Sequence, residues 1–270
     1  MSEQHPWQAV VIPEKSMHRM ADALRSPSDH DLKDHPVTQE VMAHLGPQRT
    51  VVDIGAGIGR FTVPLAAMGC DVWAIEPSAL MRDQLHQALI TNKLDSRVHT
   101  VAGLWPGVEV PMVEVALAAF VIHFSPDPRQ FVQAMEAAAT VRCVMTIHVD
   151  HMFSGLDELW AVFHPDRPTP TSPVFRDVYT LLWNEGIVAD VRVVEDPSRD
   201  GFWRDPHKVL DGLADLLQID TDAEREHLAT LVREGWGTRG GHPDAFVPSV
   251  GNRVLDTPKN IEWRVVARDG

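Results

Sequence analysis

The sequence predicts an α/β fold: a mostly parallel sheet of seven strands, with helices on both faces and a largely helical cap. Three observations lead to this expectation. A β-branched strand, a glycine turn and a helix follow one another over residues 51–68. A continuous apolar run at 113–124 suits a strand buried on both faces of a parallel sheet. Two insertions follow, in a chain whose 270 residues are enough for one large domain with additions.

The first strand runs into a glycine-rich turn, VVDIGAGIG, over residues 51–59. Asp53 lies two residues before the first of the glycines at 55, 57 and 59, and residues 60–68 have a helical pattern that ends at Gly69. Glycine lets a backbone approach a ligand closely, and a helix N-terminus offers free N–H groups. We therefore expect a ligand at this turn.

The second strand, residues 71–75, ends in Glu76, which follows Gly57 by nineteen residues. An acid at the tip of this strand can accept hydrogen bonds from both hydroxyls of a ribose. The glycines are spaced G-x-G-x-G, whereas dinucleotide enzymes use G-x-G-x-x-G. The alternatives are a nicotinamide-type site and a glycine turn that merely packs a helix on a strand.

The segments Asp53-Ile-Gly-Ala-Gly-Ile-Gly59 and Glu76-Pro-Ser78 resemble the class I S-adenosylmethionine-dependent methyltransferases, more loosely over about residues 51–149. The resemblance implies a Rossmann-like methyltransferase fold, S-adenosyl-L-methionine as cofactor and S-adenosyl-L-homocysteine as product. It assigns cofactor binding to Asp53, Gly55, Ala56, Gly57, Gly59, Glu76, Pro77, Met81, Gly103, Leu104, Trp105, Ala119 and Phe120.

Ser78 is expected to cap a helix that runs to about residue 90, and a short strand follows at 98–102. In the family, residues just past this strand touch adenine, often through an acid or amide. Here the residues are Gly103-Leu104-Trp105-Pro106, so Leu104 or Trp105 could pack on the purine ring instead. The equal alternative is that Trp105 is a wall of the core.

The fourth strand and the turn after it lack the Asp/Asn-Pro-Pro-Tyr tetrad of many amino-group methyltransferases, because residues 118–121 read AAFV. This weakens an amino-methylation or nucleobase interpretation. His123 lies just beyond the strand tip and is a candidate general base. A single histidine in such a place is more often structural, and that alternative stays open.

Asp127-Pro128 predicts a helix start, and the helix runs to about residue 139. The fifth strand at 141–149 is followed by Asp150 and His151, which together with His148 could bind a metal or act as bases. Catechol-type O-methyltransferases also place an acid just after the fourth strand, and this sequence has none there. We therefore predict no metal, and keep His123, His148 and His151 as the candidate catalytic residues.

Two insertions extend the minimal fold. The first, residues 152–173, has apolar residues at helical spacing, and a helix at 174–184 and a strand at 188–194 come next. About 65 residues then precede the predicted seventh strand at 261–267, and they include helices at 206–217 and 221–234. Both insertions start from the carboxyl ends of the strands, which predicts a cap over a substrate pocket. The alternative is a surface decoration or an oligomer contact.

These patterns predict four parts of the chain. Residues 1–48 form a helical segment covering the cofactor site, with a helix at 36–45 and with Trp7, Met17, His18 and Met20 as candidate covering residues. The alternative is that these four residues only pack a terminal helix. Residues 49–196 form the Rossmann-like core, with the insertion at 152–173. Residues 197–260 form the helical cap, and residues 261–270 contain the last strand.

Charge and composition narrow the expected partners. The net charge of −14 disfavours a nucleic-acid substrate, because a field of that sign repels phosphates. The N-terminus has no secretory h-region, and the longest apolar run, residues 115–122, is too short for a bilayer, so we expect a cytoplasmic protein without membrane partners. We predict a small-molecule acceptor and leave a homodimer open.

The function predicted from the sequence is O-methylation of a small molecule in a biosynthetic pathway. The sulfonium methyl group is already a strong electrophile, so the protein has only to align the acceptor, exclude water and remove a proton where needed. The alternative is a protein of this fold without methyl transfer, either a regulatory binding module or a non-methylating biosynthetic enzyme.

Overall fold

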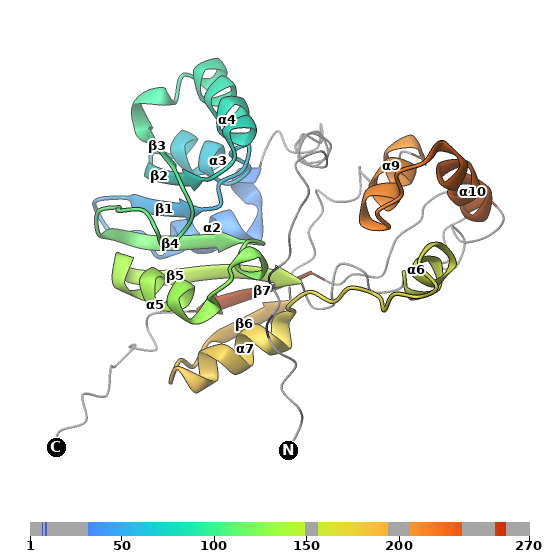
Figure 1. Ribbon diagram of the computed structural model, residues 1–270. Coiled ribbons are helices and arrows are strands. Elements are labelled where there is room, and N and C mark those ends of the chain that lie inside the picture. Colours follow the sequence, from blue (N-terminus) through green and yellow to red (C-terminus); the bar gives the residue numbers. More distant parts are fainter. Residues whose placement is uncertain are drawn as a thin grey trace.

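The computed structural model describes residues 7, 9, 32–148, 156–193, 206–233 and 252–257. Its sheet has the strand order β3-β2-β1-β4-β5-β7-β6, and strands β1 to β5 are mutually parallel (Figure 1). The strands are β1 Thr50–Ile54, β2 Asp71–Glu76, β3 Val98–Ala102, β4 Val113–Ala119, β5 Ala139–His148, β6 Asp190–Val193 and β7 Asn252–Thr257. The predicted α/β class is confirmed. The strand order reverses between β1 and β4, and ligands of open α/β sheets bind at that point, beyond the carboxyl ends of the strands.

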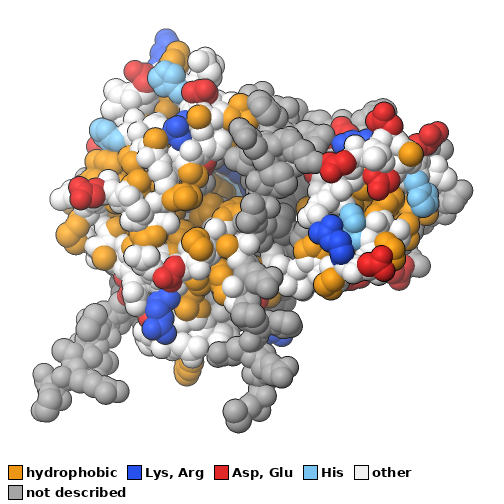
Figure 2. All heavy atoms as spheres, in the orientation of Figure 1, with side chains coloured by type: hydrophobic (Ala, Val, Ile, Leu, Met, Phe, Trp, Pro, Cys, Tyr) orange, Lys and Arg blue, Asp and Glu red, His pale blue; other side chains and the backbone are white. Residues whose placement is uncertain are grey.

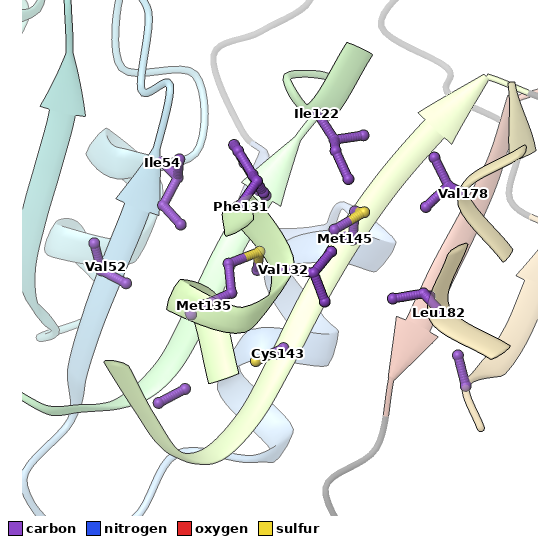
Figure 3. Close-up of a cluster of buried hydrophobic side chains, with 14 of the residues drawn as sticks. Val52, Ile54, Ile122, Phe131, Val132, Met135, Cys143, Met145, Val178 and Leu182 are labelled. Atoms are coloured by element: carbon purple, nitrogen blue, oxygen red, sulfur yellow. The ribbon is translucent and has the colours of Figure 1, made fainter. Parts of the chain in front are cut away.

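Helices cover both faces of the sheet, and each face has its own apolar core. One core joins α5 and α7 to the sheet through residues such as Phe131 and Leu182, as Figure 3 shows. The other contains residues of α2, α3 and α4. Neighbouring residues of β1 alternate between them, since Val51 belongs to the second core and Val52 to the first. These helices are α2 Pro36–Ala43, α3 Thr62–Ala67, α4 Ala79–Asn92, α5 Pro128–Ala138 and α7 Phe175–Asn184, with short 3₁₀ turns at η2 Asp95–Arg97 and η3 Ile122–Phe124.

The predicted helix starts after β2 and β4 are confirmed by their caps. The Ser78 hydroxyl accepts a hydrogen bond from the Met81 N–H at 3.4 Å, and the Asp127 carboxylate accepts one from the Gln130 N–H at 2.9 Å. Both side chains satisfy N–H groups that have no partner within the helix. Pro128 then occupies the first turn of α5, where its missing N–H costs nothing.

The seventh strand differs from the prediction. We expected it at residues 261–267, and β7 instead spans Asn252–Thr257, antiparallel to both β5 and β6. The range 261–267 has the clearer alternation of apolar and charged residues, and it lies outside the described residues. Pairing with strands far away in the sequence, which local periodicity does not encode, decides which segment enters the sheet.

The two insertions pack on each other. Helix α6 Asp157–Phe163 from the first shares an apolar cluster with α9 Pro206–Leu216 and α10 Asp222–Arg233 from the second. Trp160 is fully buried there, and His164 Nε2 lies 2.6 Å from the Leu217 carbonyl oxygen. In Figure 1 this helical body lies beyond the ends toward which β4 and β5 point. We refer to α6, α9 and α10 as the cap helices.

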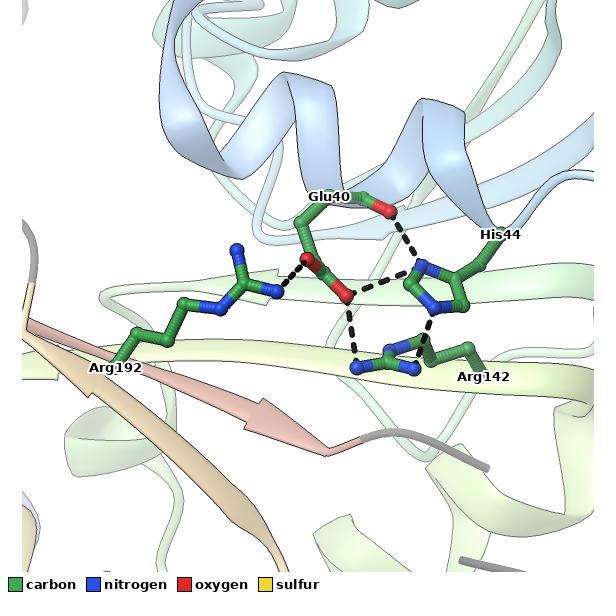
Figure 4. A network of polar contacts seen from close by, with 4 residues as sticks. All are labelled: Glu40, His44, Arg142 and Arg192. Atoms are coloured by element: carbon green, nitrogen blue, oxygen red, sulfur yellow. Dashed lines mark hydrogen bonds and ion pairs between the residues drawn. The ribbon is translucent and has the colours of Figure 1, made fainter. Parts of the chain in front are cut away.

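A buried ionic network fastens α2 to the far strands of the sheet (Figure 4). Glu40 of α2 pairs with Arg142 of β5 at 2.8 Å and with Arg192 of β6 at 3.0 Å, and His44 Nδ1 lies 3.1 Å from the same carboxylate. The side chains of Glu40 and Arg142 are each 3% exposed. The segment before β1 is therefore anchored by charges that are expensive to separate.

Candidate functional site

The glycine turn between β1 and α3 uses its three glycines differently. Gly55, Gly57 and Gly59 have φ values of 72°, 58° and 93°, a region that other residues occupy at a cost. A Cβ atom on Gly55 would collide with Val121, and one on Gly59 would collide with Leu85, so these two positions permit close packing. A Cβ atom on Gly57 would meet nothing within 4 Å. Gly57 therefore borders open space that a ligand can occupy.

Glu76 is bound to the glycine turn. One of its carboxylate oxygens accepts a hydrogen bond from the Gly57 N–H at 2.9 Å, and the other accepts one from the Ser78 N–H at 2.8 Å. Burial raises the pKa of Glu76, while these two N–H donors and Arg82 act to lower it. A carboxylate has about four acceptor positions, so this oriented group can also accept hydrogen bonds from hydroxyl groups of a ligand.

Asp53 lies buried at the end of β1, below the same turn. Its Oδ2 atom accepts a hydrogen bond from the Thr62 hydroxyl at 2.6 Å. Burial raises the pKa of Asp53, the hydrogen bonds from Thr62 lower it and the charge of Glu76 raises it, with a net value of about 6. Two carboxylates with raised pKa values thus lie at the ends of neighbouring strands, which is a common feature of functional sites.

The connection between β3 and β4 supplies one side of this region. The Trp105 indole N–H donates to the Phe131 carbonyl oxygen of α5 at 3.1 Å, and its ring packs against the core. Trp105 therefore packs between the sheet and α5, and its contact with the adenine ring stays a prediction. Leu104 is 70% exposed and, like Met112 later in the same connection, offers free apolar surface. Gly103 has a φ of 151°, and a side chain there would collide with Val108.

The tip of β4 lies next to the glycine turn. Phe120 has a φ of 57°, which is an outlier for an aromatic residue. Its N–H donates to both the carbonyl oxygen and the hydroxyl of Thr146 in β5, at 3.0 Å and 3.1 Å. Strained residues of this kind persist where the surrounding structure holds them, often at functional sites. Ala119 and Phe120 are thereby placed close to Gly55, which Val121 approaches.

The three candidate histidines are placed unequally. His123 lies in η3 with 3% exposure, its ring 4.1 Å from that of Phe124, and burial lowers its pKa to about 4. His148 is the last residue of β5 and pairs with Asn252, while His151 lies outside the described residues. His123 is therefore neutral at pH 7 and a weak base, and the general-base role stays a prediction for all three.

The structure describes only some of the residues on which the N-terminal and metal predictions depend. The Trp7 indole N–H donates to the Ser125 carbonyl oxygen at 2.9 Å, so this residue reaches the turn after β4. Met17, His18 and Met20 lie outside the described residues, as does Asp150. Within the described ranges, no group of three or more His, Cys, Asp or Glu side chains could hold a metal ion. No helix in these ranges is long and apolar enough to traverse a bilayer.

Sequence reasoning missed the threonines that support the site. Thr62 holds Asp53 and Thr146 holds Phe120, each by a hydroxyl group. A threonine in the first turn after a glycine loop is a weak signal, because the same residue is common as an ordinary helix start.

Figure 2 shows a hollow with hydrophobic side chains on the part of the core that faces the cap helices.

Comparison with known proteins identifies a methyltransferase domain in one part of the chain and a shared fold over most of it. Residues 52–140 match the family model described as a methyltransferase domain. The chain is similar in structure to a candidate sarcosine dimethylglycine methyltransferase from Galdieria sulphuraria, with 13% identity, a TM-score of 0.55 and coverage of 84% of this chain and 85% of that one. No curated protein matches the chain significantly.

Two further solved structures share this architecture. One is described as a candidate methyltransferase from an antibiotic biosynthesis pathway of Anabaena variabilis, with 19% identity, a TM-score of 0.54 and coverage of 84% and 99% of the two chains. The other is the YcgJ protein from Bacillus subtilis, with 13% identity, a TM-score of 0.54 and coverage of 83% and 96%. At such identities the similarity shows the fold, and the acceptor has to be argued from this chain's own residues.

Proposed function

We propose that this chain, which belongs to the class I S-adenosylmethionine-dependent methyltransferases, methylates an oxygen atom of a small organic molecule. S-adenosyl-L-methionine is the cofactor, and it supplies an electrophilic methyl group. The observation that carries the proposal is the hydrogen bond from the Gly57 N–H to the Glu76 carboxylate, which lies at the point where the strand order reverses. The biosynthetic role is part of the same proposal.

The residues at the strand ends fit the chemical groups of this cofactor. The oriented Glu76 carboxylate would accept hydrogen bonds from the two ribose hydroxyls, and the open space at Gly57 lets the ligand approach the backbone. Asp53 would face the methionine part, whose ammonium group has the opposite charge. Leu104 offers exposed apolar surface to the adenine ring. No covalent enzyme intermediate is required.

The acceptor proposal depends on the surroundings of the β4 tip. Phe120 and Val121 bring apolar side chains to this tip, and the described residues form no basic cluster there that would attract a nucleic acid. The cap helices belong to insertions that leave the strand ends, and we propose that these insertions enclose the acceptor and exclude water. The chain's net charge of −14 also favours a small molecule over a polyanion.

The weak basicity of His123 limits the chemical classes of acceptor that the site could methylate. A histidine with a pKa of about 4 removes a proton poorly from an aliphatic alcohol. A carboxylic acid, ionised at neutral pH, needs no base, and a phenol needs only a modest one. We therefore favour an acidic oxygen as acceptor, with His148 and His151 as the residues that could serve a less acidic hydroxyl.

Two measurements on the full chain test the proposal. Calorimetry should show binding of S-adenosylmethionine and S-adenosylhomocysteine, and much weaker binding of nicotinamide dinucleotides. A panel of phenols, carboxylic acids, alcohols and amines is then assayed for release of S-adenosylhomocysteine. Tighter binding of a nicotinamide dinucleotide would refute the cofactor assignment, and turnover confined to amines would refute O-methylation.

A further inference from the structure

Thr62 lies directly against Asp53 although nine residues separate them. It is the first residue of α3 and is fully buried. Its hydroxyl donates to Asp53 Oδ2 at 2.6 Å, and its backbone N–H forms a second hydrogen bond with the same carboxylate. Two donors from one residue therefore fix both the position and the orientation of a carboxylate that has almost no contact with water.

Among the described residues, the other groups around Asp53 do not stabilise its negative charge. In the sheet register its neighbours are Ala74 of β2 and Leu117 of β4, both apolar. Glu76, at the end of β2, has the same sign and disfavours ionisation of Asp53. Arg60 of the turn has its guanidinium carbon 5.3 Å from the centre of the Phe61 ring. Within the described residues, Thr62 is thus the residue whose hydrogen bonds favour the charged form of Asp53.

We propose that Thr62 is a positioning residue of the cofactor site, whose hydroxyl keeps Asp53 ionised and oriented so that cofactor binding follows the charge of Asp53. The proposal rests on the proposed function, since it takes the methionine part of the cofactor as the group that Asp53 faces. Both the cofactor and its product carry an α-ammonium group there. An ionised Asp53 attracts that group, and a protonated one does not.

The experiment measures the affinity for S-adenosylhomocysteine against pH, in the wild type and in Thr62→Val, which keeps the size and branching of the side chain. In the wild type, affinity should fall as acidification protonates Asp53, near its pKa of about 6. Thr62→Val removes a donor that favours the anion, so protonation should occur about one pH unit higher, with about threefold weaker binding near pH 6.5 and about tenfold weaker binding well below pH 6. At about pH 8.5 Asp53 is ionised again, and the affinities should agree within about twofold.

Three further variants make the result specific. Thr62→Ser keeps the hydroxyl and should keep the wild-type profile, whereas Asp53→Asn should bind weakly with no titration near pH 6. Thr38→Val makes the same change at another fully buried threonine, in α2, and should leave the profile unchanged. Thermal unfolding shows whether each variant is folded, and Thr62→Ala replaces Thr62→Val if that variant does not fold.

The outcomes separate this inference from the proposed function. If the wild type binds S-adenosylhomocysteine at no pH, the proposed function fails. If the wild type binds but the folded variant without the hydroxyl has the same pH midpoint, the inference about Thr62 is wrong. Binding that is equally weak at every pH, without recovery at high pH, would also overturn it, because that result describes a packing defect.

Discussion

Replacement of Glu76 tests the hydrogen bonds that link the end of β2 to the glycine turn, on which the proposed cofactor site depends. The Glu76 carboxylate accepts hydrogen bonds from the Gly57 N–H at 2.9 Å and the Ser78 N–H at 2.8 Å. Glu76→Ala removes the acceptor for both donors and for the ribose hydroxyls. Glu76→Gln keeps one carbonyl oxygen, but its amide nitrogen must face one of the two N–H groups, so one hydrogen bond is lost and two donors are opposed.

The magnitude follows from these contacts. Hydrogen bonds to a charged group contribute about 1.5–3 kcal/mol, which corresponds to a loss of about tenfold to 150-fold in cofactor affinity for Glu76→Ala. Leaving the Gly57 and Ser78 N–H groups without their acceptor should lower the free energy of unfolding by about 1–3 kcal/mol. Glu76→Gln should lie between Glu76→Ala and the wild type in affinity.

Calorimetry with S-adenosylhomocysteine measures the affinity, and urea unfolding without ligand measures stability. Glu226→Ala, at an exposed position of α10, is the matched control and should change neither. Unchanged affinity in folded Glu76→Ala would refute the assignment of Glu76 to the ribose. A loss of affinity that vanishes when the unfolded fraction is subtracted would show that Glu76 only stabilises the turn.

Three further predictions concern other parts of the chain. Because burial lowers the pKa of His123 to about 4, His123→Gln should lower the melting temperature but leave turnover and cofactor affinity nearly unchanged; a loss of about 100-fold in turnover with unchanged cofactor affinity would instead identify His123 as the base. Glu40→Ala removes the carboxylate that pairs with the buried Arg142 and should lower the free energy of unfolding in urea by about 3–5 kcal/mol. Arg192→Ala, at a partner that is 62% exposed, should cost less than about 1 kcal/mol, so equal losses in these two variants would contradict this account of the network. Turnover should be unaffected by EDTA, and its recovery only with magnesium would promote Asp150 and His151 to ligands.

Local chemistry in the sequence predicted much of the fold and part of the site. The glycine turn, the acid at the end of β2 and the starts of α4 and α5 were all readable, because each depends on groups within a few residues of one another. The continuous apolar run at β4 likewise predicted a strand covered on both faces, and two separate cores cover it.

Long-range packing decided the rest. The periodicity of the sequence did not predict that β7 would be Asn252–Thr257. It also did not predict that Trp160 would share a core with Leu213 and Leu217 from the other insertion. The sequence placed His123 beside the site, but only the tertiary structure buried it and lowered its pKa to about 4. The hydrogen bond from Thr62 to Asp53 is also a feature that only the tertiary structure decided. Periodicity and capping depend on near neighbours, whereas burial, strand pairing and the ionisation of a carboxylate depend on which distant segments meet around it.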